Sequence, residues 1–163
     1  MKKLLAVIPI LAVIIIADYF YSKYHVAPDL NFSALSLTTL DGEPITLSSI
    51  KGKKLFLFFF GTSSGSSVKQ VPSLEMAQSK LNANNFCFIC ISDEPVDTLK
   101  KFKQLTNFHL PMLHLKQKLS DLNILTLPTS YILNTKGELV YKKTGERDWE
   151  DEDIIHELQM SSE

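Results

Sequence analysis

The chain of 163 residues has only two cysteines, Cys87 and Cys90. Both lie in the apolar run 86–91, which predicts a core strand. Side chains three residues apart on a strand point to opposite faces, and their Cα atoms are about 10 Å apart. A disulfide needs a Cα separation below about 7 Å, and a mid-strand thiol also lacks the helix N-terminus that lowers the pKa of reactive cysteines. We therefore expect two inert core thiols and a fold that holds together without disulfides.

The chain also lacks an excess of basic residues, since 17 lysines and arginines face 18 acids, for a net charge of −1. A nucleic-acid-binding protein needs a clustered basic face, so this class is excluded. The negative charge gathers in residues 146–163, which hold eight acids and one base, Arg147. This segment predicts a terminal helix with a solvated acidic face.

Metal-binding clusters are missing as well. His109 and His114 flank Met112, a combination of ligand types that copper accepts. The two remaining histidines, His25 and His156, lie far from them in the sequence, so no ligand set emerges. We expect neither a metal nor another cofactor.

The N-terminus has the pattern of a targeting segment. Lys2 and Lys3 precede fourteen uncharged residues, 4–17, and Asp18 and three aromatic residues follow. The lysines favour a cytoplasmic N-terminus. Fourteen residues fall short of the roughly 20 that span a bilayer, so a cleaved signal peptide is the alternative to an anchor. We predict that residues 1–22 form an uncleaved single-pass anchor in the inner membrane, and that residues 23–31 tether a domain on the periplasmic or extracytoplasmic side.

Residues 32–163 predict a single α/β domain. Strand-like runs alternate with helical periodicity, and a hairpin and a helix follow at the end. We expect strands at 32–37 and 45–47 (joined by the Asp41-Gly42 turn), 54–60, 86–91, 111–115, 131–133 and 138–143, and helices at 64–83, 95–105 and 148–160, with helical turns at 117–123. The run 55–60 has no polar alternation, so its strand is expected to be buried on both faces. This order favours three layers around a mixed central sheet.

The segment between the predicted buried strand and the first predicted helix consists of glycine, serine and threonine residues. Residues 61–67 read Gly-Thr-Ser-Ser-Gly-Ser-Ser and satisfy the G-x-S-x-G pattern of a hydrolase nucleophile. A hydrolase sheet has several strands before that turn, and here the acids near His156 share a helix with it, which is a poor geometry for a base. A phosphate loop would need a Gly-Lys-Ser/Thr sequence that is absent. Both interpretations are disfavoured.

Four further segments, in order, resemble a known family. Residues 32–53 are similar to an N-terminal hairpin, Leu127-Pro128-Thr129 to a cis-proline loop, 134–137 to the turn after it, and 145–149 to a Gly-x-x-Asp-Trp segment. Together they resemble the membrane-anchored thioredoxin-like proteins of the TlpA and ResA type. The resemblance implies a thioredoxin-like fold with an N-terminal β-hairpin extension, and thiol–disulfide exchange outside the cytoplasm.

By this resemblance the two redox cysteines of the family fall on Ser64 and Ser67. Ser63 and Ser66 replace the usual tryptophan and proline, and Gln70 a frequent glutamate. An alcohol forms no disulfide, so the nucleophile and its resolving partner are both missing.

We therefore predict a non-catalytic module. A groove formed by Ser63, Ser64, Ser67, Leu127 and Pro128 would hold a protein or peptide partner outside the cytoplasm, partly through main-chain hydrogen bonds. The alternative is a thiol–disulfide oxidoreductase of the TlpA type that serves cytochrome c maturation or reduces exported thiols.

Overall fold

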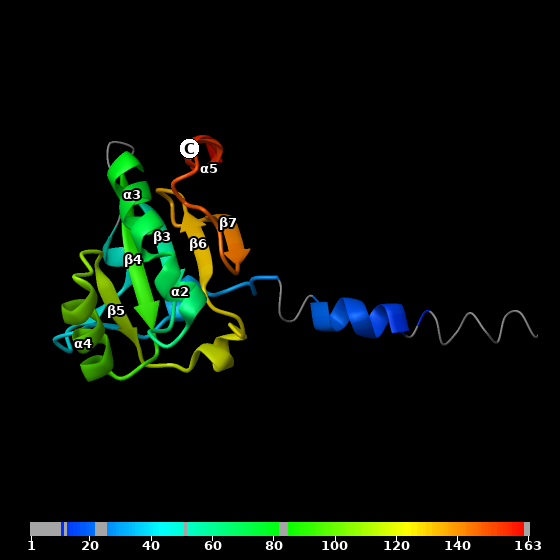
Figure 1. Cartoon of the computed structure of the whole chain (residues 1–163), viewed down its shortest axis with the longest axis horizontal. Helices are drawn as coiled ribbons and strands as arrows, with labels where there is room; N and C mark the ends of the chain where they lie inside the picture. Colours follow the sequence, from blue (N-terminus) through cyan, green and yellow to red (C-terminus); the bar gives the residue numbers. More distant parts are fainter. Residues whose placement is uncertain (1–10, 12, 22–25, 51, 82–84, 162–163) are drawn as a thin grey trace, which may run out of the picture.

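The computed structural model describes all residues except 1–10, 12, 22–25, 51, 82–84 and 162–163. One seven-stranded mixed sheet organises the domain, in the order β2-β1-β5-β4-β3-β6-β7 (Figure 1). The strands are β1 (Leu37–Thr39), β2 (Pro44–Ile45), β3 (Lys54–Phe59), β4 (Phe86–Ser92), β5 (Met112–Leu115), β6 (Thr129–Leu133) and β7 (Leu139–Thr144). The mixed α/β class predicted from the sequence is confirmed.

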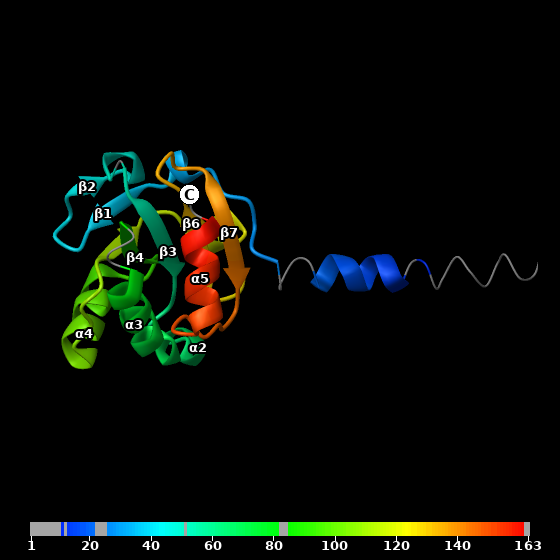
Figure 2. The same cartoon turned by 90° about the horizontal axis from the view of Figure 1, so that it is seen from above.

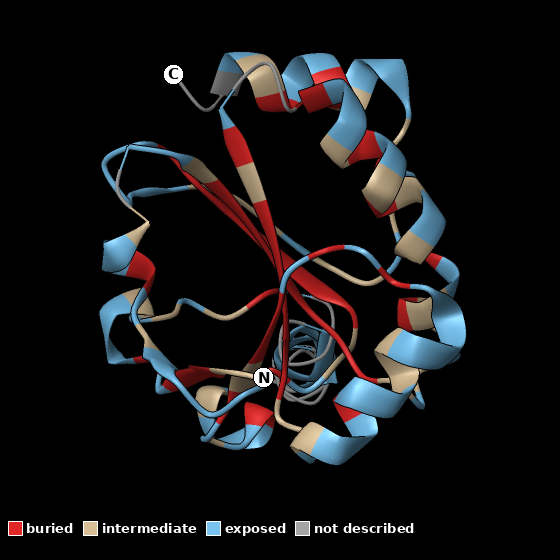
Figure 3. Ribbon diagram, turned by 90° about the vertical axis from the view of Figure 1, so that its left-hand side faces the viewer, coloured by how far each residue is buried: buried red, intermediate tan, exposed pale blue. Residues whose placement is uncertain are grey.

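The centre of the sheet is parallel and its margins are antiparallel. β3 pairs in parallel with β4, and β4 with β5, whereas β6 runs antiparallel to β3. β7 and the β1–β2 hairpin extend the two edges with antiparallel pairs. The run 55–59 is buried throughout, as expected for a strand covered on both faces (Figure 3). Because β3, β4 and β5 are parallel, the loops that follow them begin at the same end of the sheet, where the carboxyl ends of these strands lie.

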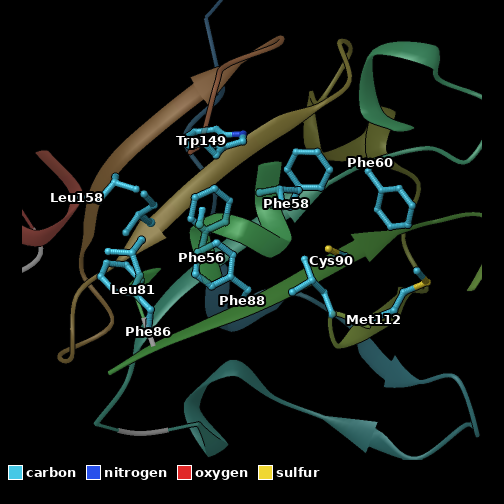
Figure 4. Close-up of a cluster of buried hydrophobic side chains, with 14 of the residues drawn as sticks. Phe56, Phe58, Phe60, Leu81, Phe86, Phe88, Cys90, Met112, Trp149 and Leu158 are labelled. Carbon is cyan, nitrogen blue, oxygen red and sulfur yellow. The ribbon is translucent and has the colours of Figure 1, made fainter. Parts of the chain in front are cut away.

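The two faces of the sheet have different covers. The helices are α2 (Gly65–Lys69), α3 (Val71–Leu81), α4 (Val96–Thr106) and α5 (Glu152–Ser161). The helices α3, α4 and α5 lie on one face of the sheet (Figure 2). Side chains of all three belong to one core cluster, part of which Figure 4 shows. The other face is covered by the N-terminal segment and by short 3-10 turns, namely η1 (Phe32–Ala34), η2 (Leu47–Ser49) and η4 (Leu119–Leu122). The second outer layer is consequently thin.

The core under the helices is aromatic. Phe56 stacks on Phe88, with ring centroids 4.6 Å apart, and meets Trp149 edge-on at 4.8 Å. Figure 4 shows these rings together between the sheet and α5, with Leu158 beside them. Trp149 and Leu158 are completely buried. The segment 145–149 is thus fixed to the domain core.

Three predicted elements differ from the structure. The helix expected over 64–83 is two helices, because Gln70 N bonds the Ser67 carbonyl at 3.2 Å and α3 starts afresh at Val71. Pro72, without an N–H, fits the first turn of this new helix. Residues 82 and 83 of the predicted helix lie outside the described residues.

The last helix begins at Glu152 instead of Asp148, because the Asp151 carboxylate caps it by accepting from the N–H of Asp153 at 2.9 Å. The strand expected from Phe32 is the turn η1, where the Asn31 side chain accepts from Ser33 N and holds a 3-10 turn. The hairpin itself is confirmed, but its strands are short.

Of the predicted anchor, residues 1–10, 12 and 22 lie outside the described residues, as do residues 23–25 of the predicted tether. Residues 13–21 are helical, and their large apolar side chains are exposed. Among the helices that the structure describes, none is both long enough and apolar enough to cross a membrane.

Candidate functional site

The serine-rich segment occupies the edge of the sheet where β3 ends and α2 begins. Ser64 is the N-cap of α2, with extended backbone, and its side-chain oxygen accepts from Ser67 N at 3.3 Å. Serine suits this position because its oxygen satisfies an N–H that the helix cannot pair. The local fold thus depends on the hydroxyl of Ser64, and Ser63 before it is exposed.

The serine hydroxyls form a continuous hydrogen-bond chain. Ser67 Oγ, completely buried, donates to Ser64 Oγ at 3.0 Å, and Ser64 Oγ and Ser66 Oγ are 3.1 Å apart. Ser66 Oγ donates to the Leu127 carbonyl at 3.0 Å. Each hydroxyl has one proton, so this last bond requires Ser64 to donate to Ser66. The chain therefore has one direction, from Ser67 to the Leu127 carbonyl.

The Leu127–Pro128 peptide bond is cis, as the resemblance implied. The Pro128 carbonyl accepts from Gly145 N at 2.8 Å, so it is already paired. The Leu127 carbonyl accepts from Ser66 and retains a second lone pair. The structure thus joins Ser64 and Ser67 to the Leu127–Pro128 loop through a residue, Ser66, that the sequence analysis did not include in the groove.

Sequence reasoning also missed Glu94. Both of its carboxylate oxygens lie within hydrogen-bond distance of Thr62 N, at 3.2 and 3.0 Å. Glu94 follows β4 at the same edge of the sheet where Thr62 follows β3. An acid just after a buried parallel strand was a signal available in the sequence. Its charge gives the serine loop a fixed carboxylate neighbour.

Gln70 links the site to the aromatic core. It follows α2 directly and is 4% exposed, and its Oε1 accepts from the Trp149 indole N–H at 2.7 Å. Within the described part of the chain, its Nε2 has no hydrogen-bond partner. Gln70 N meanwhile bonds the carbonyl of Ser67. The position of α2 is thereby tied to the segment 145–149.

The two cysteines lie in β4, as predicted, and face opposite sides of the sheet. Cys90 belongs to the cluster under the helices and Cys87 packs against the cluster on the other face. Both are free thiols. Burial raises the pKa of Cys90 far above its ordinary value of 9.0, and burial also raises the pKa of Cys87, which Lys53 partly offsets. Neither thiol is activated.

We expect both thiols to react slowly with a disulfide reagent such as 5,5′-dithiobis(2-nitrobenzoate) at pH 7–8. A raised pKa keeps the thiolate fraction below that of a free cysteine, so the rate at Cys87 should keep rising with pH beyond 9.0. Cys90 should react only after unfolding in guanidinium. Stopped-flow absorbance over pH 7–10 checks this, with C87S assigning each phase. Rapid labelling of either thiol at pH 7 would contradict the described burial.

Within the residues that the structure describes, no three side chains of histidine, cysteine, aspartate or glutamate are arranged to hold a metal ion. The groups that contact the serine loop in the hydrogen bonds above are neutral hydroxyls, peptide groups and the carboxylate of Glu94. Such a set can donate and accept hydrogen bonds, and it contains no sulfur between residues 61 and 70.

Comparisons with known proteins identify the family of this chain. The chain is 30% identical over 116 residues to the thioredoxin-like protein YneN of Bacillus subtilis, which covers 68% of this chain and 65% of YneN. It is 29% identical to the thiol-disulfide oxidoreductase ResA of Halalkalibacterium halodurans, which covers 67% of this chain and 64% of ResA. The chain thus matches somewhat less than two thirds of the length of these relatives.

Solved structures share the fold. A thiol:disulfide interchange protein of Chlorobium tepidum superposes with a TM-score of 0.60 at 20% identity, covering 83% of this chain and 99% of the other. StoA of Bacillus subtilis gives 0.60 at 21% identity, covering 80% and 98%. The AhpC/TSA family profile matches residues 25–142. The chain belongs to the AhpC/TSA family, within the thioredoxin-like proteins.

Proposed function

We propose that this protein is a thioredoxin-like module that binds an extended segment of a protein partner and performs no disulfide exchange. The observation that carries the proposal is the hydroxyl chain from Ser67 through Ser64 and Ser66 to the Leu127 carbonyl. On this proposal Ser64 and Ser67 stand at the dithiol positions of the family. Oxygen at both positions leaves no group there that can accept or release an electron pair by disulfide chemistry.

Binding would use the main chain beside Pro128. The Leu127 carbonyl is oriented by Ser66 and can accept a second hydrogen bond. Leu127 is half-buried and Pro128 is buried. An extended segment that reaches the Leu127 carbonyl would pair with it through main-chain hydrogen bonds, which give affinity with little demand on partner sequence. Ser63 is exposed and precedes the helix cap Ser64, and Leu125, two residues before Leu127, is 39% exposed. The groove thus offers hydrogen bonds and some apolar surface.

We further propose that the module is tethered outside the cytoplasm by the N-terminal segment. Supporting this are the two lysines and the uncharged run 4–17, and the exposed apolar side chains of the helical residues 13–21. A periplasmic or extracytoplasmic position would bring the groove to exported proteins. The inner membrane is the expected location.

The second candidate function is that of an oxidoreductase acting through Cys87 or Cys90. Its support is the family membership, since a named relative is a thiol-disulfide oxidoreductase. The two thiols are free, but they lie on opposite faces of the sheet and their pKa values are raised. We therefore place it second.

Two measurements on the full chain separate these functions. In an insulin-reduction assay the native chain should give no more turnover than C87S/C90S, and any excess would establish the oxidoreductase. In cells, a photo-crosslinking residue at Ser63 should form a discrete adduct with an exported protein. The same residue at Leu105, which is 76% exposed on α4, serves as the matched control. Equal adducts from both positions would argue against a groove-specific partner.

A further inference from the structure

A second hollow lies at the opposite end of the sheet from the serine site. It has a volume of about 390 Å³, within the range of small-molecule sites. Its floor is apolar, formed by Phe32, Leu47, Ile50, Leu55 and Leu133. Leu55 is the second residue of β3, whereas the serines follow the end of that strand. Six residues of strand separate the two places by about 20 Å.

The thin cover of this face explains the hollow. The 3-10 turns η1 and η2 form one wall, and the β6–β7 turn at residues 134–137 forms the other. No α-helix of the described chain contributes a lining residue, so the gap between the two walls is left unfilled. The hollow is a consequence of how the N-terminal segment covers the sheet.

Both walls are held by their own hydrogen bonds. Asn134 is 8% exposed, and its Oδ1 accepts from the N–H groups of Lys136 and Glu138 at 3.0 Å each. On the other wall Asn31 Oδ1 accepts from Ser33 N, and Ser49 Oγ donates to the Thr46 carbonyl. The shape therefore exists without an occupant, which lowers the cost of binding.

The charge at the rim is positive. The lining residues include two lysines, Lys53 and Lys136, and no acid. Four lysines, Lys69, Lys80, Lys100 and Lys142, and Arg147 form ion pairs with carboxylates elsewhere in the described chain. Among the described residues, neither rim lysine forms an ion pair. One acid lies beside the lining, Glu138, whose carboxylate accepts from Asn134 Nδ2 at 2.8 Å. The two ammonium groups outnumber it, and a positive rim beside an apolar floor attracts a negative charge attached to an apolar body.

We propose that this hollow, lined by Phe32, Leu47, Leu55 and Leu133 with Lys53 and Lys136 at its rim, binds a small organic anion. The ligand class is a compact apolar body with one carboxylate or phosphate group. The body displaces water from the floor and the anionic group meets the two ammonium groups. This site goes beyond the partner-binding function and does not depend on it.

The test uses the isotope-labelled full chain in phosphatidylcholine nanodiscs, titrated with 4-phenylbutyrate and followed by amide chemical shifts. We expect saturable shifts at Ser33, Ser48 and Lys136. The neutral analogue 4-phenyl-1-butanol should bind about fivefold more weakly, because it lacks the charge. Acetate alone should produce no saturable shift. A further arm with 2-phenylethyl phosphate shows which anionic group the rim prefers.

Variants then locate the interaction. K53Q/K136Q should abolish the preference for the acid over the alcohol, whereas K101Q, an exposed lysine on α4, should leave it unchanged. S48W should reduce affinity by filling the hollow, and its amide spectrum reports whether it is folded. The proposal is overturned if the shifts fail to saturate, map elsewhere, or if acid and alcohol bind equally to the native chain.

Discussion

Replacement of Trp149 by alanine is expected to destabilise the domain by about 3–5 kcal/mol, the range for deleting a large buried aromatic side chain. Trp149 is completely buried and contacts Phe56 and Tyr141 edge-on, with ring centroids 4.8 and 6.1 Å away. The free energy of unfolding of a single domain is only about 5–15 kcal/mol, so this one substitution removes a large share of it. Urea unfolding followed by circular dichroism measures the loss. L105A, at a site 76% exposed, should stay within about 0.5 kcal/mol of the native chain.

Two conservative variants separate packing from hydrogen bonding. W149F keeps a ring but removes the indole N–H, so the side-chain amide of Gln70 loses its only hydrogen-bond partner among the described residues. Leaving the buried Gln70 amide unpaired should cost about 1–3 kcal/mol. In W149F/Q70L both polar groups are gone, and the double variant should be more stable than W149F. If W149F and W149F/Q70L unfold at the same urea concentration, the hydrogen bond has no role in stability.

Replacement of Trp149 should also affect the serine site, because Gln70 connects the two. This residue follows α2 directly, and its N–H bonds the carbonyl of Ser67. Loosening the 145–149 segment therefore also loosens the helix that carries the hydroxyl chain. Amide hydrogen exchange should accelerate in α2 of W149F before it accelerates in β3, because β3 is held on both sides by β4 and β6.

The parts of the fold that the sequence predicted well are those set by local hydrophobic pattern. The unbroken apolar run 55–60 predicted a central strand, and the thiols of Cys87 and Cys90 were correctly assigned to opposite faces of the next one. The break at Gln70 was missed because the apolar stripe of Val68, Val71 and Leu74 continues through it. At the break Gln70 N bonds the Ser67 carbonyl, and the Gln70 side chain bonds Trp149, which is 79 positions away in the sequence.

The candidate site was predicted in part. The resemblance brought Ser64, Ser67 and the Leu127–Pro128 loop together, and the hydroxyl chain connects them. Ser66 entered the prediction only as a missing proline. The family motif describes the proline usual at this position, so it could not indicate the hydrogen bond that a serine makes there. The bond from Ser66 to the Leu127 carbonyl also joins residues 61 positions apart in the sequence. Glu94 was missed although its place just after a buried strand was a signal, because the pairing of β4 with β3 was needed to put its loop beside Thr62.

The second large effect is expected from S64C/S67C, which should turn the chain into a disulfide reductase. In the native chain Ser64 Oγ and Ser67 Oγ are 3.0 Å apart and already point at each other. Two thiols at these positions therefore need only small side-chain rotations to reach the S–S bond length of about 2.05 Å. The N–H of Ser67, which now donates to the Ser64 oxygen, would donate to a thiolate at position 64. Such donation lowers a thiol pKa and favours attack on a disulfide.

The assay is insulin reduction with dithiothreitol as electron source, in a C87S/C90S background so that only the new thiols can act. We expect turnover at least about tenfold above the native chain, because catalysis requires the thiolate and its resolving partner together. S64C alone should form mixed disulfides without turnover. The rate should remain below that of family members, since Ser63, Ser66 and Gln70 keep the neighbours that differ from the usual pattern.

The result separates two explanations of the serine-rich loop. If the double variant forms its disulfide by mass spectrometry and turns over, the scaffold lacks only sulfur, and the native chain is a redox-silent form of the fold. If it forms the disulfide and stays inactive, the positions are geometrically right but the groove no longer accepts a disulfide substrate. If no disulfide forms, Ser64 and Ser67 are not the dithiol positions, and the assignment that supports partner binding there must be abandoned. Only the first outcome is compatible with a groove that still holds an extended segment beside Leu127, because a reductase must bind its substrate by that same edge before sulfur can act.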